Sequence, residues 1–275
     1  MDVTAFLDHV PALFDGDPMA VGPADPAYAR VVEQVAGYTS ANELAVLNLA
    51  AKLLPEGEAY LEVGTFKGRS LCGAVIGVSG RTFYASENYL EFGMLGQEAR
   101  DELQRNLDEH AAGVDVRLIE GDCFVTLAKP GVIQQPVGVY FYDGKHTTLA
   151  HYLALGLVEP LLADKALVLV DDATWPVVQK AHRSYLARHD GWEVVARWDA
   201  TQTGDPLWAN GLHALKYVRP AERRLGHSRD VSWLRRAQVG AVGPAESAAW
   251  HTLHRYPQLV PLAKKLYPKK PSRIE

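Results

Sequence analysis

Two groups of polar residues, about thirty positions apart, are the part of this sequence best suited to chemistry. Asp143 and His146 belong to the first group, and Asp171 and Asp172 form the second. Each group directly follows an apolar run of five or six residues, the pattern of a strand buried on both faces of a parallel sheet. Parallel strands place their carboxyl ends at the ligand-binding edge of an open α/β sheet. We therefore expect three carboxylates and an imidazole to converge there, a set suited to a divalent cation and a general base.

Each of these residues also has a simpler interpretation. One carboxylate of Asp171 and Asp172 could cap the helix expected near Trp175, but metal ligation is preferred because Asp143 supplies a third oxygen. His146 could be a turn histidine with a satisfied hydrogen bond, although its spacing from Asp143 makes a catalytic role at least as good an interpretation. The other histidines of this region are expected to be packed or surface residues, namely His151, His182, His189 and His213.

The pattern around these residues alternates between strands and helices. A helix is predicted over 27–38, and Ser40 with Glu43 fits a capping box that opens the next helix, which ends before Pro55. The expected strands are 59–63, 81–86, 114–119, 137–142 and 166–170, and the helices that follow them are 69–78, 94–111, 124–128, 147–162 and 175–189. Strands at 192–198 and 212–218, joined through a loop, complete a largely parallel sheet with an antiparallel edge.

Length and composition fit one large α/β domain with an appendage. The chain has 275 residues, of which 48% are hydrophobic, enough for a full core. Acidic residues occupy the N-terminus where a signal peptide would carry basic ones, and no apolar run approaches the roughly 20 residues of a membrane span, so a cytoplasmic protein is expected. Cys72 and Cys123 lack the spacing of a zinc or redox site and are expected to be buried thiols in a reducing compartment.

Charge divides the chain unevenly. Residues 1–219 contain 17 basic and 29 acidic residues, a net charge of −12. Residues 220–275 contain 11 basic and 4 acidic residues, a net charge of +7, and the two parts together give −5. We predict an N-terminal helical cap at 1–54, a core at 55–219 and a basic, helical extension at 220–275. Aromatic and leucine residues separate the basic pairs of the extension, which favours docking on the acidic body or a second subunit over binding to nucleic acid.

A glycine motif follows the first strand. Gly64 and Gly68 give the spacing G-x-x-x-G and allow close backbone approach at a helix N-terminus. A dinucleotide fold would show G-x-G-x-x-G, and the bulky Phe66 argues against a nicotinamide cofactor. Glu87 ends the next strand, where a carboxylate can accept two hydrogen bonds from a ribose. Asp122 ends the third strand, within reach of an adenine amino group.

Together, EVGTFKGRS at 62–70, Glu87 and Gly121-Asp122 resemble the motifs of class I S-adenosylmethionine-dependent methyltransferases over about residues 38–218. Within that superfamily, DGKHT at 143–147 and Asp171-Asp172 resemble the metal-dependent O-methyltransferases of small molecules, including those that methylate sugar hydroxyls of macrolides. The resemblance implies a Rossmann-like α/β fold whose seven-stranded, mostly parallel sheet has helices on both faces and an antiparallel last strand. Lys145 departs from the family, because an acid is common at its position.

The resemblance also implies roles for individual residues. Asp143, Asp171 and Asp172 would hold Mg²⁺, and His146 would be the general base. Thr39 and Ser40 resemble the stretch that helps to hold the methionine end of the cofactor. The full set of implied cofactor-binding residues is Thr39, Ser40, Glu62, Gly64, Thr65, Gly68, Ser70, Glu87, Asp122 and Asp143.

The resulting hypothesis is a Mg²⁺-assisted, S-adenosylmethionine-dependent O-methyltransferase of a small hydroxylated acceptor such as a natural-product sugar or a phenol. One alternative is a metal-independent enzyme in which His146 is the base and the acids hold the acceptor. Another is a cofactor-binding module that acts through its basic tail. A homo-oligomer without membrane or nucleic-acid partners is expected, since the N-terminal helices and the tail offer surfaces for self-association.

Overall fold

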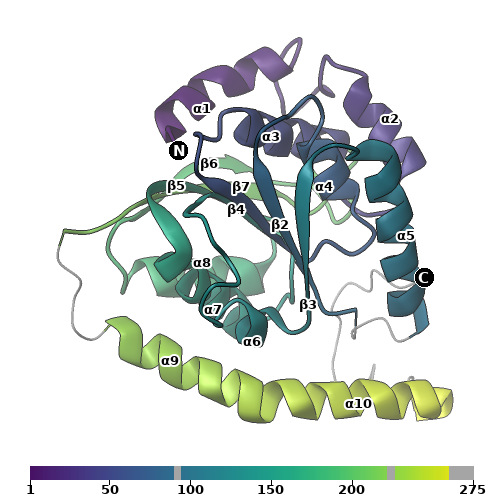
Figure 1. Ribbon diagram of the computed structural model, residues 1–275, viewed down its shortest axis with the longest axis vertical. Coiled ribbons are helices and arrows are strands. Elements are labelled where there is room, and N and C mark those ends of the chain that lie inside the picture. The colour runs from purple at the N-terminus through teal and green to yellow at the C-terminus, as the bar shows by residue number, and fades with distance from the viewer. Residues whose placement is uncertain (90–93, 222–226, 260–275) are drawn as a thin grey trace.

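A seven-stranded sheet with the order β3-β2-β1-β4-β5-β7-β6 forms the centre of the computed structural model, which describes residues 1–89, 94–221 and 227–259 (Figure 1). The strands are β1 (Ala59–Val63), β2 (Thr82–Glu87), β3 (Asp115–Glu120), β4 (Val137–Tyr142), β5 (Leu162–Val170), β6 (Trp192–Trp198) and β7 (Leu212–Val218). Strands β1 to β5 pair in parallel, and β7 pairs antiparallel with both β5 and β6. The predicted Rossmann-like sheet with its antiparallel last strand is therefore confirmed.

Helices cover both faces of the sheet (Figure 1). One face carries α3 (Ala41–Lys52), α4 (Arg69–Ala74) and α5 (Met94–His110), with α1 (Val3–His9), the 3₁₀ turn Val10–Leu13 and α2 (Ala27–Gln34) outside them. The other face carries α6 (Cys123–Thr126), α7 (Thr148–Val158), the 3₁₀ turn Glu159–Leu161 and α8 (Pro176–Leu186). This arrangement buries all five residues of β1 and all six of β4, as the continuous apolar runs predict.

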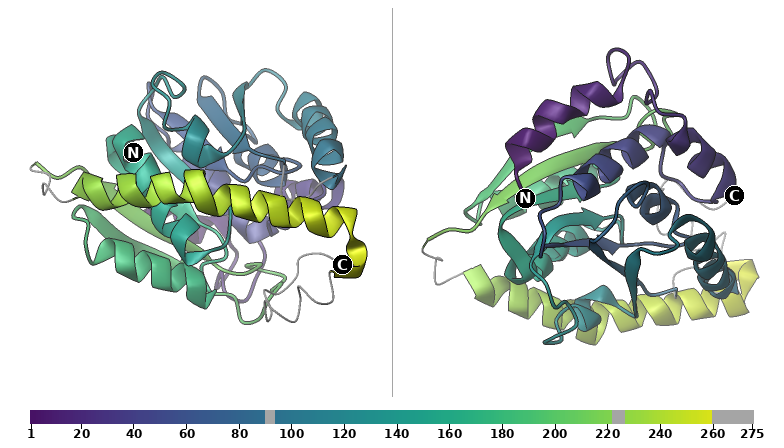
Figure 2. Two further views of the ribbon diagram at one scale, coloured as in Figure 1. Left: turned by 90° about the horizontal axis from the view of Figure 1, so that it is seen from below. Right: turned by 45° about the horizontal axis from the view of Figure 1, so that its top comes forward.

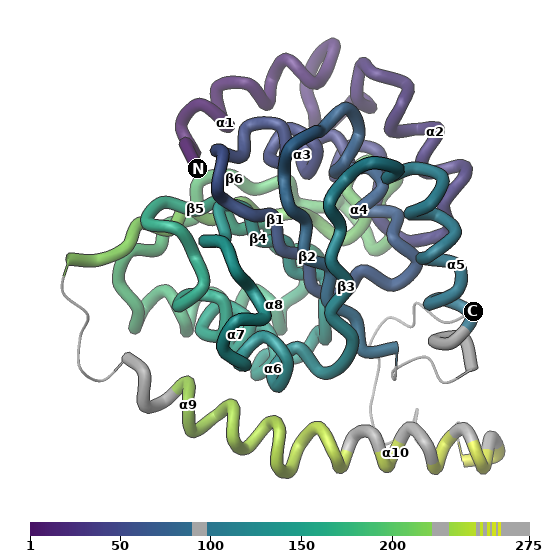
Figure 3. The backbone as a smooth tube through the Cα atoms, viewed as in Figure 1, coloured from purple at the N-terminus to yellow at the C-terminus, as the bar shows by residue number. Residues whose placement is uncertain are grey.

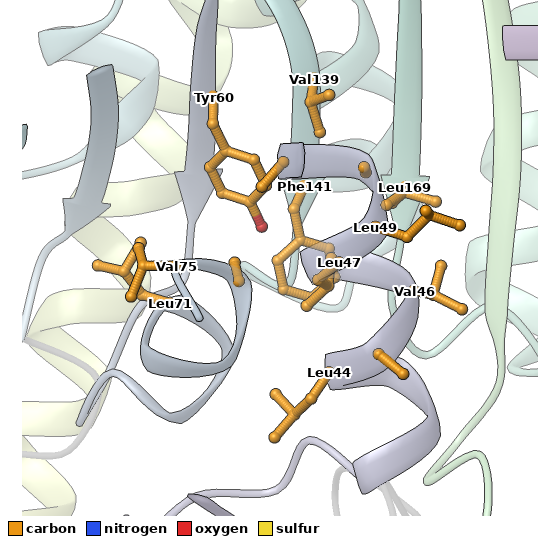
Figure 4. Close-up of a cluster of buried hydrophobic side chains, with 14 of the residues drawn as sticks. Leu44, Val46, Leu47, Leu49, Tyr60, Leu71, Val75, Val139, Phe141 and Leu169 are labelled. Atoms are coloured by element: carbon orange, nitrogen blue, oxygen red, sulfur yellow. The ribbon is translucent and has the colours of Figure 1, made fainter. Parts of the chain in front are cut away.

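The predicted capping box opens α3. The Ser40 hydroxyl accepts a hydrogen bond from the backbone N–H of Glu43, and the Glu43 carboxylate accepts one from the N–H of Ser40 at 2.7 Å. Ten consecutive residues of this helix are buried, because the sheet lies on one side and the N-terminal helices on the other. Figure 4 shows Leu44 and Leu47 of α3 in the cluster that includes Phe141 of the sheet.

Several predicted helices end earlier than expected, among them the helix predicted over 27–38, which ends at Gln34, and the helix predicted over 175–189, which ends at Leu186. The helix predicted over 147–162 ends at Val158, because Pro160 lacks the N–H that would continue it and a 3₁₀ turn takes its place. The strand predicted from Ala166 consequently begins at Leu162. The helix predicted over 69–78 ends at Ala74, three residues before Gly77, which has the left-handed φ of +65° common at helix ends.

The described part of the C-terminal extension, residues 227–259, is helical and forms an outer layer beneath α6 to α8 (Figures 1 and 2). This part consists of α9 (His227–Ala237), a π-helical turn (Gln238–Val242), α10 (Gly243–Arg255) and a 3₁₀ turn (Pro257–Leu259). Figure 3 draws the backbone of the whole fold as a tube in the same view as Figure 1. Helix α9 packs on α7 at Gly156, where a Cβ atom would lie 2.7 Å from Val231. None of the described helices combines the length and apolarity needed to cross a membrane.

Candidate active site

The ends of β1, β4 and β5 bring the predicted acids together. The backbone N–H of Asp143 donates to the carbonyl of Val63 at 2.9 Å, and the N–H of Asp171 donates to the carbonyl of Tyr142 at 3.0 Å. These bonds continue the parallel hydrogen-bond ladder beyond β4 and β5. Asp143 is thereby held against the end of β1, and Asp171 against the end of β4. Both acidic groups thus lie at the carboxyl edge of the sheet, as predicted.

Asp143, His146 and Asp172 form the tightest group. Each offers one ligand atom, and these atoms lie within 4.8 Å of one another. The His146 Nδ1 atom is 2.7 Å from the Asp172 Oδ2 atom, and its Nε2 atom is 3.9 Å from the Asp143 Oδ1 atom. In the described part of the chain, Asp171 is not a member of this group.

Asp172 is held by its backbone and by a neighbouring loop. Its φ of +55° is in the left-handed region that non-glycine residues rarely adopt, and its side chain is fully buried. The Asn210 amide donates to the Asp172 Oδ1 atom at 2.7 Å, while the N–H of Asp172 donates to the Asp171 carboxylate at 2.7 Å. The capping alternative was wrong, because the N-cap of α8 is Trp175 and no side chain caps that position.

The chemistry of this donor set fits a divalent cation. Asp171 and Asp172 are adjacent and at most 1% exposed, and Asp143 lies close to Asp172. Burying several carboxylates together is costly unless a positive charge compensates them, and Mg²⁺ prefers oxygen ligands of this kind. Asn210, which sequence reasoning missed, belongs to the same centre through its bond to Asp172. The only signal in the sequence was the Asn210-Gly211 pair before β7, which indicates a turn but not its neighbours.

Both motif glycines have left-handed backbones, and Gly64 is also in close contact with backbone atoms. Gly64 has a φ of +96°, and a Cβ atom there would lie 2.1 Å from the carbonyl oxygen of Asp143. Gly68 has a φ of +88° at the N-cap of α4, and its Cβ atom would lie 2.5 Å from Leu103. Gly64 therefore lets the β1 loop pass directly against the loop that carries Asp143, whereas Gly68 supplies the left-handed turn that opens α4.

Glu62 lies at the base of this loop. It is fully buried, and its carboxylate accepts hydrogen bonds from the Ser70 hydroxyl at 2.9 Å and the Tyr60 hydroxyl at 3.4 Å. Burial raises the pKa of Glu62 to about 7, although its hydrogen bonds with Ser70, Thr65 and Tyr60 oppose that shift. A small cavity above it is lined by five of the predicted cofactor residues, namely Thr39, Gly64, Thr65, Ser70 and Asp143.

Thr39 and Ser40, in the segment before α3, make hydrogen bonds with residues around this cavity. Besides capping α3, the Ser40 hydroxyl donates to the carbonyl of Leu207 at 2.7 Å. The carbonyl of Thr39 accepts a hydrogen bond from Arg69, whose guanidinium also binds the carbonyl of Val35 at 2.6 Å. These contacts fix the segment before α3 against α4, and they give Ser40 a structural role in addition to the one implied by the resemblance.

Glu87 and Asp122 end neighbouring strands. The Glu87 carboxylate accepts hydrogen bonds from the backbone N–H groups of Phe66 at 2.8 Å and Asn88 at 2.7 Å, which places it beside the glycine loop. Asp122 accepts a hydrogen bond from the N–H of Phe124 at 2.8 Å and caps α6. Both carboxylates are partly exposed at the same sheet edge as the cavity.

Comparison with known proteins finds chains of similar fold. Residues 61–173 match the family model described as a methyltransferase domain. The O-methyltransferase TomG of Streptomyces achromogenes, solved with S-adenosylmethionine, is 18% identical over 80% of this chain and 100% of its own, with a TM-score of 0.52. An O-methyltransferase of Bacillus cereus in complex with S-adenosylhomocysteine is 15% identical over 78% of this chain and 97% of its own, with a TM-score of 0.54.

A cofactor-bound structure from MTB, that of Rv0187, is 21% identical over 79% of this chain and 96% of its own, with a TM-score of 0.53. No curated protein sequence matches this one. At these identities the solved structures establish the fold, and the family model identifies the domain at 61–173. The chain therefore has the fold of these solved S-adenosylmethionine- and S-adenosylhomocysteine-bound O-methyltransferases, and its residues 61–173 match the methyltransferase-domain model.

Proposed function

We propose that this protein is a Mg²⁺-assisted O-methyltransferase that transfers the methyl group of S-adenosylmethionine to a hydroxyl of a small molecule. The observation that carries the proposal is the group of Asp143, His146 and Asp172, whose ligand atoms lie within 4.8 Å of one another. Asp143 also lines the cavity beside the glycine loop. One residue thus borders both the site for a reacting hydroxyl and the site for a methyl donor.

The cofactor is proposed to lie along the carboxyl edge of the sheet. Its methionine end would occupy the cavity above Glu62, bordered by Thr39, Gly64, Thr65 and Ser70. Ser40 and Gly68 would position the helices around that cavity. The ribose hydroxyls would bind to Glu87, and the adenine amino group would bind to Asp122, because carboxylates accept hydrogen bonds from both kinds of donor.

His146 is proposed to be the general base. An alcohol is a poor nucleophile at neutral pH, so a placed base contributes about 10² to 10⁴ in rate. The Asp172 carboxylate, 2.7 Å from the His146 Nδ1 atom, would orient the imidazole and leave Nε2 for the acceptor proton. Methyl transfer then needs in-line positioning of the acceptor oxygen, since sulfonium is already an activated donor.

Asp143, Asp171 and Asp172 are proposed to hold the Mg²⁺ ion, which would stabilise the alkoxide and lower the pKa of the acceptor hydroxyl. The spacing in the structure supports a second assignment, in which His146 replaces Asp171 as a ligand. Calorimetric titration with Mg²⁺ separates the two. Loss of binding in Asp171→Asn with retention in His146→Gln supports the first assignment, and the opposite result supports the second.

The acceptor is proposed to be a natural-product sugar or a phenol, since the similar TomG is an O-methyltransferase involved in tomaymycin synthesis. Mass spectrometry of reactions with sets of glycosides and phenols would detect methylated products. Failure to bind S-adenosylhomocysteine in calorimetry would refute the proposed function. Full activity with a chelator present would leave the metal-independent enzyme, with His146 as base and the acids holding the acceptor.

Asp143→Asn and Asp164→Asn form a matched pair for the metal. Asp164 is an exposed residue near the opposite end of β5, paired with Arg219 at 2.8 Å. The first variant should lose at least 10²-fold in rate and no longer respond to Mg²⁺, whereas the second should behave as the unmodified enzyme. Equal rates in the two variants would contradict the metal assignment.

Self-association is proposed for the N-terminal helices and the basic extension. The opposite net charges of residues 1–219 and 220–275 support contacts between the two regions, within one chain or between copies. Light scattering of the full chain at low and high salt tests this proposal. Binding to RNA or duplex DNA that weakens steeply with salt would favour the tail-mediated alternative.

A further inference from the structure

The middle of the C-terminal extension lies against α6, the short helix that Asp122 caps (Figure 1). Val231 of α9 and Val239 of the π-helical turn pack on the hydrophobic core cluster that includes Phe124 of α6. These apolar contacts fix the path of the extension beside the segment that follows β3. The extension is therefore held next to the residue that we propose to bind the adenine amino group.

Gln238 begins the π-helical turn and is the buried residue among the five of that turn, with 3% of its surface exposed. Its side-chain carboxamide makes no hydrogen bond with another residue in the described ranges, and it is not sealed from solvent. Single π-helical turns within longer helices are frequent at functional sites. A carboxamide that is neither bonded to the protein nor sealed from solvent is available to a ligand.

Gly243, the first residue of α10, shows where this carboxamide lies. A Cβ atom built on Gly243 would be 3.1 Å from the Gln238 carbonyl oxygen and 3.9 Å from both the Gln238 Nε2 and the Asp122 Oδ2 atoms. The two side-chain atoms thus lie around one open position, at most twice 3.9 Å apart. The Asp122 Oδ1 atom accepts the N–H of Phe124 at 2.8 Å, whereas Oδ2 has no donor in the part of the chain that the structure describes.

We propose that Gln238 is a further cofactor-binding residue, which binds the adenine edge of S-adenosylmethionine together with Asp122. This inference rests on the proposed function, in which the Asp122 carboxylate binds the adenine amino group. That group carries two hydrogens, so Asp122 can accept one and the Gln238 side-chain oxygen can accept the other. The Gln238 amide then donates to the ring nitrogen beside the amino group, N1 or N7, in the bidentate pairing typical of carboxamides and adenine.

This pairing would give the C-terminal extension a role in cofactor selectivity. A carboxylate only accepts hydrogen bonds, so Asp122 alone would bind any base with an amino group in the right place. A carboxamide offers a donor and an acceptor side by side, so Gln238 would recognise the amino group and the adjoining ring nitrogen together. The extension would then form one wall of the adenine pocket, while the sheet supplies the rest of the cofactor site.

Calorimetric titration of the full chain with S-adenosylhomocysteine and with its 1-deaza and 7-deaza analogues tests the assignment. Each analogue replaces one ring nitrogen of adenine with C–H and keeps the amino group. The unmodified chain should bind at least one analogue about 10- to 100-fold more weakly than S-adenosylhomocysteine, as the loss of one half of a bidentate pair predicts. In Gln238→Leu that penalty should vanish for one analogue, because leucine cannot donate to the ring nitrogen.

Asp122→Asn separates the two residues of the pocket. It should weaken binding of S-adenosylhomocysteine but keep the penalty for the analogue, since Gln238 is still present. A merely structural role for Gln238 would lower the affinity for all three ligands by the same factor and leave the penalties unchanged.

Gly243→Leu and Gly240→Leu form a matched pair in the same part of the extension. The leucine at 243 would fill the open position between Gln238 and Asp122, whereas nothing lies within 4 Å of a Cβ atom at Gly240. Gly243→Leu should bind S-adenosylhomocysteine at least tenfold more weakly, and Gly240→Leu should bind it as the unmodified chain does. Urea melts of both variants check that the fold is retained.

Several results would overturn the assignment. It fails if Gln238→Leu keeps the penalties of the unmodified chain for both analogues, or if the unmodified chain binds all three ligands equally. Unchanged affinity in a folded Gly243→Leu chain also contradicts it. An unmodified chain that binds no S-adenosylhomocysteine instead refutes the proposed function, on which the role of Gln238 depends.

Discussion

Replacing Gly64 with alanine should disable the site, whereas the same change at Gly80 should cost only stability. Both glycines have left-handed backbones, with φ of +96° and +64°. An L-residue in that region costs about 1 to 2 kcal/mol. The backbone strain alone should therefore lower the free energy of unfolding of both variants by about 1 to 2 kcal/mol. Any steric clash of the added Cβ atom comes on top of this loss.

The collision occurs only at Gly64. Its added Cβ atom would lie 2.1 Å from the carbonyl oxygen of Asp143, whereas nothing lies within 4 Å at Gly80. Since contacts under 3.0 Å are not tolerated, the loop that carries Asp143 must move by about 1 Å. A displacement of about 1 Å at a reacting centre can lower the rate about 10²-fold.

Urea denaturation, calorimetry with S-adenosylhomocysteine and methyl-transfer rates together test this comparison. We expect Gly80→Ala to bind the cofactor product and to turn over as the unmodified enzyme does. Gly64→Ala should lose at least tenfold in affinity and about 10²-fold in rate, in addition to the shared loss of stability. The reasoning is refuted if Gly64→Ala retains full affinity and rate, or if Gly80→Ala loses as much as Gly64→Ala does.

Three further predictions concern buried groups. Asn210→Leu removes the donor to Asp172 and should weaken Mg²⁺ binding 10- to 100-fold in calorimetry. Burial raises the pKa of Glu62 from 4.5 to about 7, so the cofactor-free protein should lose stability as pH rises through that range. Urea melts of Glu62→Gln should lack this loss. The pKa of His182 falls from 6.5 to about 3, so the unfolded chain binds protons first and stability should fall below pH 6.5. Urea melts of His182→Phe should show a smaller fall.

Short-range sequence patterns predicted the strands of the sheet and the start of α3 correctly. The Ser40 and Glu43 capping box involves residues three apart, so its geometry follows from the sequence alone. The continuous apolar run of β4 identified a strand buried on both faces and therefore placed Asp143 at the sheet edge. Helix ends were less accurate where a proline or glycine changed the last turn, as at Pro160.

The members of the acidic centre were harder to predict, because neighbours in sequence can face different ways. The left-handed backbone of Asp172 brings its carboxylate to His146, while the carboxylate of Asp171 accepts the N–H of Asp172. Asn210 reaches Asp172 from 38 positions away, through a loop whose path depends on the packed sheet. No periodicity in the sequence reports such a contact.

The backbone of Asp172 lowers stability at a residue that we propose to bind the metal. A non-glycine residue with a φ of +55° and a fully buried carboxylate raises the free energy of the folded chain on both counts. Glycine would relieve both costs and remove the carboxylate. A thermostability screen that ignores activity should therefore collect Asp172→Gly among its improved variants, although that variant would lack the proposed metal ligand.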